Sequence, residues 1–158
     1  MAVTLLMSGC TRSGDSLALV KVTSTDILAQ VAKHKEREAV LVNFWATWCA
    51  PCVEEFPMIV DVARTWQDKG LKVYFVSVDW LEQIDRARTF LEQQGVTGVS
   101  FIKDQKDNPF IDGITEAWTG AVPFTVAYSK RTGDIVDYWE GKAPREKFEA
   151  AIKAALSD

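Results

Sequence analysis

The sequence has few of the residues that bind metals or cross-link a small domain. Its 158 residues include one histidine and three cysteines. A zinc site needs about four ligands, and neither Cys10 nor His34 has a partner at zinc-ligand spacing, so we expect no metal centre. With so few cysteines, the fold must depend on a hydrophobic core, which a chain of this length can bury.

Strong charge and long apolar runs are also absent. The formal net charge is −4, so electrostatics gives no reason to expect binding to nucleic acid or to anionic lipid. No apolar run approaches the roughly 18–20 residues that span a bilayer. Apolar residues make up 47% of the chain and charged residues 25%, as in an ordinary globular protein. Without repeats or linkers, we expect one domain over residues 16–158, acting as a monomer.

Residues 1–15 look like a separate region. The apolar stretch Val3–Met7 is followed by Ser8-Gly9 directly before Cys10, which resembles the lipobox of bacterial lipoproteins. The stretch is shorter than the usual ~7–15 residues and no Lys or Arg precedes it. The resemblance implies that Cys10 is lipidated and that a signal remnant and tether precede the domain. The alternative is a frayed terminus with an incidental free cysteine.

Hydrophobic patterning alternates between strands and helices along the domain. Ala39–Trp45 is a continuous apolar run, typical of a strand buried on both faces. Apolar residues then recur at helical spacing from Phe56 to Trp66, and Gly70 ends that helix. The other expected strands are 17–22, 71–78, 124–128 and 135–139, and the other expected helices are 24–35, 82–94 and one that starts near residue 144. Residues 102–115 receive no assignment.

This order of elements predicts the fold class. Alternating strands and helices give a parallel sheet with helices on both faces. The turn Thr132-Gly133-Asp134 adds an antiparallel hairpin at one edge. We therefore expect an α/β fold, a thioredoxin-like three-layer sandwich with a central mixed β-sheet flanked by helices.

Cys49 and Cys52 lie between a predicted buried strand and a predicted helix. A helix starting at Cys49 directs free N–H groups and the positive end of the helix dipole at its sulfur, which lowers the thiol pKa and makes Cys49 the nucleophile. Cys52, one turn later on the same face, can then resolve a mixed disulfide. We expect Trp48 and Pro51 to flank the sulfur on the substrate side. A structural bridge is a weaker interpretation, because so short a loop contributes little stability.

The segment Val-Asn-Phe-Trp-Ala-Thr-Trp-Cys-Ala-Pro-Cys (42–52) with Glu-Glu-Phe-Pro (54–57) resembles the membrane-tethered, extracytoplasmic thiol–disulfide oxidoreductases of the TlpA/ResA type. Residues 118–125 resemble that family's second signature, which carries a cis-proline beside the cysteines. The resemblance implies that Pro123 is cis and that the Val122 backbone pairs with an extended substrate. A trans proline leading into a strand is the alternative.

The same resemblance implies a functional glutamate at Glu55. A partly buried glutamate has a raised pKa and can take the proton of Cys52; the alternative is a solvated surface side chain, as we expect for Glu54. Thioredoxin has a buried aspartate where this chain has Asn43, and an amide cannot accept that proton. The proton transfer therefore falls to Glu55 or to water.

The resemblance implies an exported enzyme that reduces protein disulfides and needs no cofactor beyond the Cys49–Cys52 pair. Its implied substrates are apocytochrome c or other extracytoplasmic proteins, and a membrane dithiol donor recharges it. Two alternatives use the same cysteines: a thiol peroxidase, whose reactive cysteine usually lacks a partner at this spacing, and a metal or haem chaperone. A structural interaction module would leave the pair unexplained.

Overall fold

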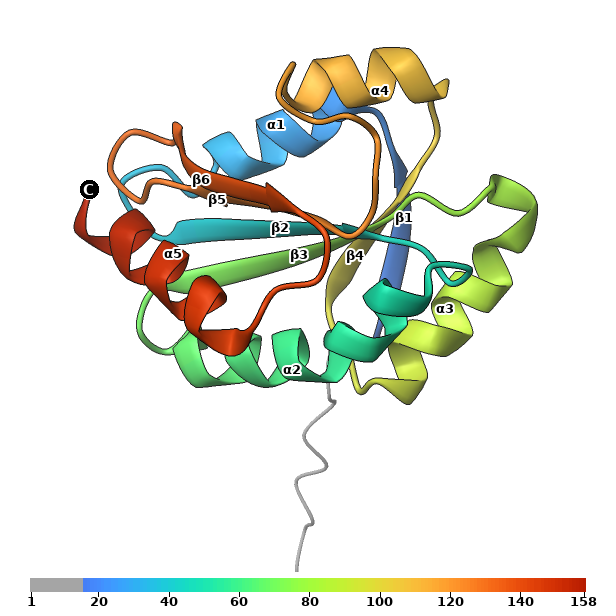
Figure 1. The fold of residues 1–158 in the computed structure, drawn as a ribbon, viewed down its shortest axis with the longest axis horizontal. Helices are drawn as coiled ribbons and strands as arrows, with labels where there is room; N and C mark the ends of the chain where they lie inside the picture. The colour runs from blue at the N-terminus through green and yellow to red at the C-terminus, as the bar shows by residue number, and fades with distance from the viewer. Residues whose placement is uncertain (1–15) are drawn as a thin grey trace, which may run out of the picture.

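A computed structural model describes residues 16–158 as a six-stranded sheet between two layers of helices (Figure 1). The strands are β1 (Ala18–Val22), β2 (Ala39–Trp45), β3 (Leu71–Ser77), β4 (Val99–Lys103), β5 (Phe124–Tyr128) and β6 (Ile135–Glu140). The helices are α1 (Ser24–Ala32), α2 (Ala50–Gln67), α3 (Ile84–Gln93), α4 (Asp107–Ile114) and α5 (Arg145–Ser157), with a short 3-10 turn η1 (Leu81–Gln83) before α3. The predicted signal remnant and tether, with Cys10, lie outside the described residues.

The strands follow the order β1-β4-β3-β2-β5-β6 across the sheet. The first four in that order are parallel, while β5 runs antiparallel to β2 and β6 antiparallel to β5. β2 is therefore central, and every one of its residues is buried. The predicted mixed sheet with an antiparallel hairpin at its edge is confirmed.

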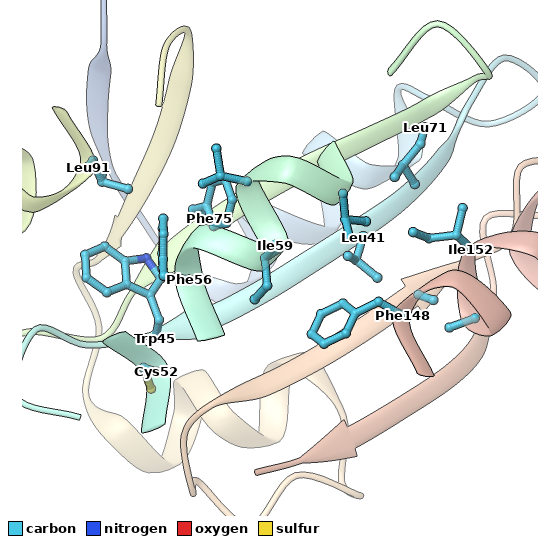
Figure 2. Packing of buried hydrophobic residues seen from close by; sticks show 14 of the residues in the cluster. Leu41, Trp45, Cys52, Phe56, Ile59, Leu71, Phe75, Leu91, Phe148 and Ile152 are labelled. Atoms are coloured by element: carbon cyan, nitrogen blue, oxygen red, sulfur yellow. The ribbon is translucent and has the colours of Figure 1, made fainter. Parts of the chain in front are cut away.

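The alternation of β2 divides the interior into two cores. Val40, Val42 and Phe44 pack with residues of α1 and α4 on one face. Leu41 and Trp45 pack with residues of α2, α3 and α5 on the other. Figure 2 shows this second core, where Trp45, Phe56 and Phe75 lie together and Cys52 lies at the end of the group. The active-site helix α2 is thus fixed to the sheet by a large apolar face.

The stretch between the predicted helix 82–94 and the predicted strand 124–128 adds two elements. Strand β4 fits between β1 and β3, so the sheet has one more strand than the pattern predicted. Its apolar core is only Phe101 and Ile102, too short a run to stand out from sequence. Helix α4 contains Pro109 and Gly113, both poor helix formers, and it forms because Phe110 and Ile114 are buried against the sheet.

Parallel strands bring their carboxyl ends to one edge of the sheet. β2 and β3 run side by side over their whole length, so the segment after Trp45 lies beside the segment after Ser77. This edge is where α2 begins. None of the helices between residues 16 and 158 combines the length and the apolar character needed to cross a bilayer.

Phe56 tests the packing that holds α2. It is fully buried and its ring centroid lies 4.5 Å from Phe75, 5.0 Å from Trp45 and 5.0 Å from Phe90. We expect Phe56→Ala to lower the free energy of unfolding by about 3–5 kcal/mol, through lost burial and a cavity. Urea denaturation of the oxidised protein measures it. Val20→Ala, at an exposed position of β1, is the control and should change stability by less than about 0.5 kcal/mol.

Candidate active site

Cys49 caps the N-terminus of α2. Its backbone is extended (φ −94°, ψ 101°), and the helix begins at Ala50 with Pro51 in the first turn. The N–H of Cys52 donates to Sγ of Cys49 over 3.3 Å. An N–H that has no acceptor within the helix and the positive end of the helix dipole therefore both face this sulfur. Both stabilise the Cys49 thiolate. The predicted strand–cysteine–helix arrangement is confirmed.

The two cysteines form a disulfide. Their sulfur atoms are 2.14 Å apart and their Cα atoms 5.3 Å apart. Cys49 is 5% exposed and Cys52 1% exposed, so both residues are mostly covered and Cys49 is the more accessible of the two. Trp48, which is 50% exposed, and Pro51, also exposed, flank it on the solvent side.

The loop that precedes β5 faces Cys49. The Val122–Pro123 peptide bond is cis, as the resemblance implied. The carbonyl oxygen of Val122 lies 3.5 Å from Sγ of Cys49, although the two residues are far apart in sequence. Glu140 of β6 holds the loop, because its carboxylate accepts from the N–H of Thr119 at 2.6 Å and from its hydroxyl at 3.0 Å. The loop therefore presents a fixed backbone edge beside the reactive sulfur.

Glu55 is 3% exposed, which agrees with the buried interpretation and not with a solvated helix face. Its Oε2 accepts from the N–H of Ala143 at 3.1 Å, while its Oε1 has no hydrogen-bond partner. Burial raises the pKa of this carboxyl to about 7, against the opposing effects of the Ala143 N–H, the Lys142 charge and the Asn43 side chain. The neighbouring Glu54 is exposed and pairs with Lys142 at 2.9 Å, as expected of a surface residue.

Asn43 lies on the α2 side of β2, next to Glu55. Its Nδ2 donates to Oγ1 of Thr125 at 3.0 Å, whereas its Oδ1 has no partner. The Asn43 amide cannot be ionised. Of the two neighbours, Glu55 is therefore the one that titrates close to neutral pH. The structure thus brings together a cysteine pair, a cis-proline loop and one buried carboxyl with a raised pKa.

Asp79 was missed by sequence reasoning. It is fully buried and lies two residues after the end of β3. Its carboxylate accepts from the N–H of Thr47 at 3.0 Å, from the Thr47 hydroxyl at 2.6 Å and from the Ser77 hydroxyl at 2.7 Å. Since Thr47 is two residues before Cys49, Asp79 ties the active-site turn to the end of β3.

Trp80 was missed as well. It is 60% exposed, and its ring centroid lies 6.2 Å from that of Trp48. The sequence did contain a usable signal. Asp79 and Trp80 follow the apolar run 71–78, just as Trp48 and Cys49 follow the apolar run 39–45. Adjacent parallel strands end at one edge, so polar or aromatic residues at both ends belong to one site.

The Asp79 contacts predict a specific loss of stability. Asp79→Ala leaves the Thr47 N–H, the partly buried Thr47 hydroxyl and the buried Ser77 hydroxyl without their acceptor. We expect the free energy of unfolding to fall by about 3 kcal/mol. Chemical denaturation of the oxidised protein measures the change. Asp85→Ala, at an exposed position in α3, is the matched control. Equal stability of the two variants would contradict the anchoring role.

The Glu55 carboxyl predicts a pH-dependent stability. The pKa of Glu55 is raised from 4.5 to about 7 in the folded state. Below pH 4.5 the carboxyl is protonated in both states and folding stability is unaffected. Above pH 7 it is ionised in both states, and burying the charge lowers the free energy of unfolding by its full amount. Glu55→Gln should therefore match the wild type at pH 4 and be more stable by about 3 kcal/mol at pH 8 to 9. Denaturation of both oxidised proteins at each pH measures this. The exposed Glu54→Gln serves as control, and a gain that did not depend on pH would contradict the raised pKa.

The chain is similar to proteins that are named for disulfide chemistry. It is 28% identical over 117 residues to thiol-disulfide oxidoreductase ResA of Oceanobacillus iheyensis, covering 74% of this chain and 57% of that protein. It is 38% identical over 64 residues to thiol:disulfide interchange protein HelX of Rhodobacter capsulatus, covering 40% of this chain and 33% of the relative. The chain spans only 57% to 65% of the length of the ResA proteins from Oceanobacillus iheyensis and Bacillus thuringiensis.

Solved structures share the fold. A putative thiol:disulfide interchange protein DsbE from Chlorobium tepidum superposes with a TM-score of 0.63 at 25% identity, covering 78% of this chain and 84% of that one. StoA from Bacillus subtilis superposes with a TM-score of 0.55 at 17% identity, covering 73% and 82%, which supports the thioredoxin-like fold alone. Residues 17–125 match the AhpC/TSA family. The chain therefore belongs to the AhpC/TSA family of thioredoxin-like proteins, and within it fits the TlpA/ResA type.

Proposed function

We propose that this protein is a thiol–disulfide oxidoreductase that reduces disulfides in polypeptides through Cys49 and Cys52. One observation carries the proposal: the disulfide caps helix α2 and lies 3.5 Å from the backbone carbonyl of the cis-proline loop. The helix end stabilises the thiolate that attacks, and the loop offers a backbone edge for an extended substrate. The pair is then the redox group itself, and the cycle needs no further cofactor.

The first step is attack by the Cys49 thiolate on one sulfur of a substrate disulfide. The substrate S–S bond breaks, a mixed disulfide forms with Cys49, and one substrate thiolate leaves. Cys49 takes this role because it is the helix cap and is more accessible than Cys52. The Val122 backbone would pair with the substrate segment, and Trp48 and Pro51 would flank it.

The second step is attack by Cys52 on Sγ of Cys49. Cys52 first loses its proton, for which Glu55 is the proposed acceptor, because a carboxyl with a pKa of about 7 is well matched to a thiol near neutral pH. The new thiolate forms the Cys49–Cys52 disulfide and releases the second substrate thiolate. The substrate gains two electrons and the enzyme loses two, so a dithiol donor must reduce the enzyme again.

We further propose that the protein acts outside the cytoplasm, with acyl chains on Cys10 as its tether and a membrane dithiol as its donor. Ser8-Gly9-Cys10 in the sequence supports this, as does the resemblance to extracytoplasmic oxidoreductases. Apocytochrome c and other exported proteins with paired cysteines would be its substrates. Mass spectrometry of the protein purified from membranes tests the lipid, and an unmodified Cys10 would contradict it.

The test is the reduction potential of the full chain, measured by equilibration with dithiothreitol and glutathione buffers. We expect a reversible two-electron couple at about −270 mV or below, the range of reductants that need an electron donor. Cys10→Ser should leave the potential unchanged, whereas Cys49→Ser should abolish the couple. Cys52→Ser should accumulate the mixed disulfide with a disulfide-bonded protein such as insulin.

Other outcomes would change the assignment. A potential near about −120 mV would make the protein an oxidant rather than a reductase. Fast peroxide consumption without exchange would favour a thiol peroxidase. Tight binding of Cu(I) or haem without turnover would favour a chaperone; over residues 16–158, no three His, Cys, Asp or Glu side chains gather as a metal site would require.

A further inference from the structure

A cleft of about 260 Å³ lies beside the disulfide, between the end of β3 and helix α4. We call it the tryptophan cleft. Its lining residues are Trp48, Val78, Trp80, Lys103, Asp107, Phe110, Ile111, Trp118, Thr119 and Gly120. Pockets for drug-sized ligands are mostly larger, roughly 300–1,000 Å³, so this cleft has the size for an amino-acid side chain rather than for a cofactor.

Two indole rings are exposed to solvent at the rim of the tryptophan cleft, where neither is needed to form the core. Trp48 is 50% exposed and Trp80 60% exposed, and their centroids are 6.2 Å apart with a 33° tilt. Indole rings gain most from burial in an interface. Two of them side by side at the surface, next to a reactive sulfur, therefore indicate a contact that forms only with a partner.

The floor of the cleft is apolar and aromatic. Phe110 and Trp118 are buried with centroids 6.2 Å apart, and Trp118 stacks on Phe124 at 4.8 Å. The indole N–H of Trp118 is already used, since it donates to the carbonyl of Ala121 at 2.8 Å. The floor is thus closely packed and apolar, and the indole N–H of Trp118 is not available to an occupant.

The charges that line the cleft are matched. Lys103 and Asp107 form an ion pair with each other, and the remaining lining residues are uncharged. A charged substrate side chain would find no unpaired partner among them and would lose hydration on entering. The cleft therefore favours an uncharged, apolar occupant, and stacked rings favour an aromatic one.

The cleft continues directly from the proposed substrate edge. Gly120 and Thr119 line it, and they precede Val122, whose carbonyl faces Cys49, by two and three residues. An extended segment paired with this loop advances about 3.3 Å per residue, and alternate side chains point to the same side. A side chain about two residues from the attacked cysteine would therefore lie over the cleft.

We infer that the tryptophan cleft is a specificity pocket that takes an aromatic side chain located about two residues from the cysteine of an extended polypeptide substrate. This inference rests on the proposed function, since it names the substrate class for the Cys49 reaction. Trp48 and Trp80, whose centroids are 6.2 Å apart, form one continuous aromatic rim that packs against the ring, and Ile111 lines the cleft beneath it. Asp79 supports this arrangement, because it anchors both Thr47, before Trp48, and the turn that carries Trp80.

The test uses the reduced full chain and synthetic nonapeptides that each carry one cysteine as a mixed disulfide with thionitrobenzoate. The peptides differ in having Trp, Ala or Glu two residues before or after the cysteine. Stopped-flow release of thionitrobenzoate gives the second-order rate constants. We expect the better Trp peptide to react about tenfold faster than its Ala counterpart, the factor expected when part of an aromatic ring leaves water. The Glu peptide should be no faster than the Ala peptide.

Trp80→Ala should reduce the Trp-to-Ala rate ratio to near one, and Trp80→Phe should restore much of it. Tyr138→Ala, which removes another exposed aromatic ring that does not line the cleft, is the matched control and should keep the wild-type ratio. Equal rates for Trp and Ala peptides in the wild type, or an unchanged ratio in Trp80→Ala, would overturn the inference and leave the proposed function intact. No reaction with any peptide would overturn both.

Discussion

The N–H of Cys52 donates to Sγ of Cys49, and the rest of the site is arranged around that hydrogen bond. It exists because α2 starts one residue after Cys49. The helix starts there because β2 is buried to its last residue, Trp45, and the turn that follows is held by Asp79. Helix, strand and turn together put one sulfur at the positive end of a helix, and the reactivity of Cys49 follows from that position.

A second constraint acts inside the sheet. Glu55 and Asn43 are buried polar residues between β2 and α2, and each has one oxygen without a hydrogen-bond partner. Burying such groups costs stability. The cost is lower when Glu55 is protonated, because its O–H then becomes a donor among acceptors and its charge is gone. A carboxyl placed in this way titrates near neutral pH, as the proposed acceptor of the Cys52 proton should.

Much of this architecture could be predicted from sequence, and the parts that could not have physical causes. Ala39–Trp45 was recognisable as the central strand because a fully buried strand leaves a continuous apolar run. The cis bond at Pro123 could be predicted only from a family signature, since the local sequence favours the trans isomer. Strand β4 and helix α4 were missed because tertiary packing of Phe101 and Phe110, not local propensity, stabilises them. Asp79 and Trp80 were missed because nothing in their local sequence marks a site, and their signal lies only in their position after a strand that pairs with β2.

The order of strands in the sheet affects when the nascent chain can complete its fold. β1 pairs with β4 and not with its neighbours in sequence, so Ala18 can pair only after Val99 has been synthesised. β2 likewise waits for β5 to complete its second edge. Such long-range pairings form late and slowly during folding. Until β5 is in place beside β2, Cys49 lacks the Val122 loop that faces it in the folded protein. The surroundings of Cys49 are thus complete only when this late strand pairing has formed.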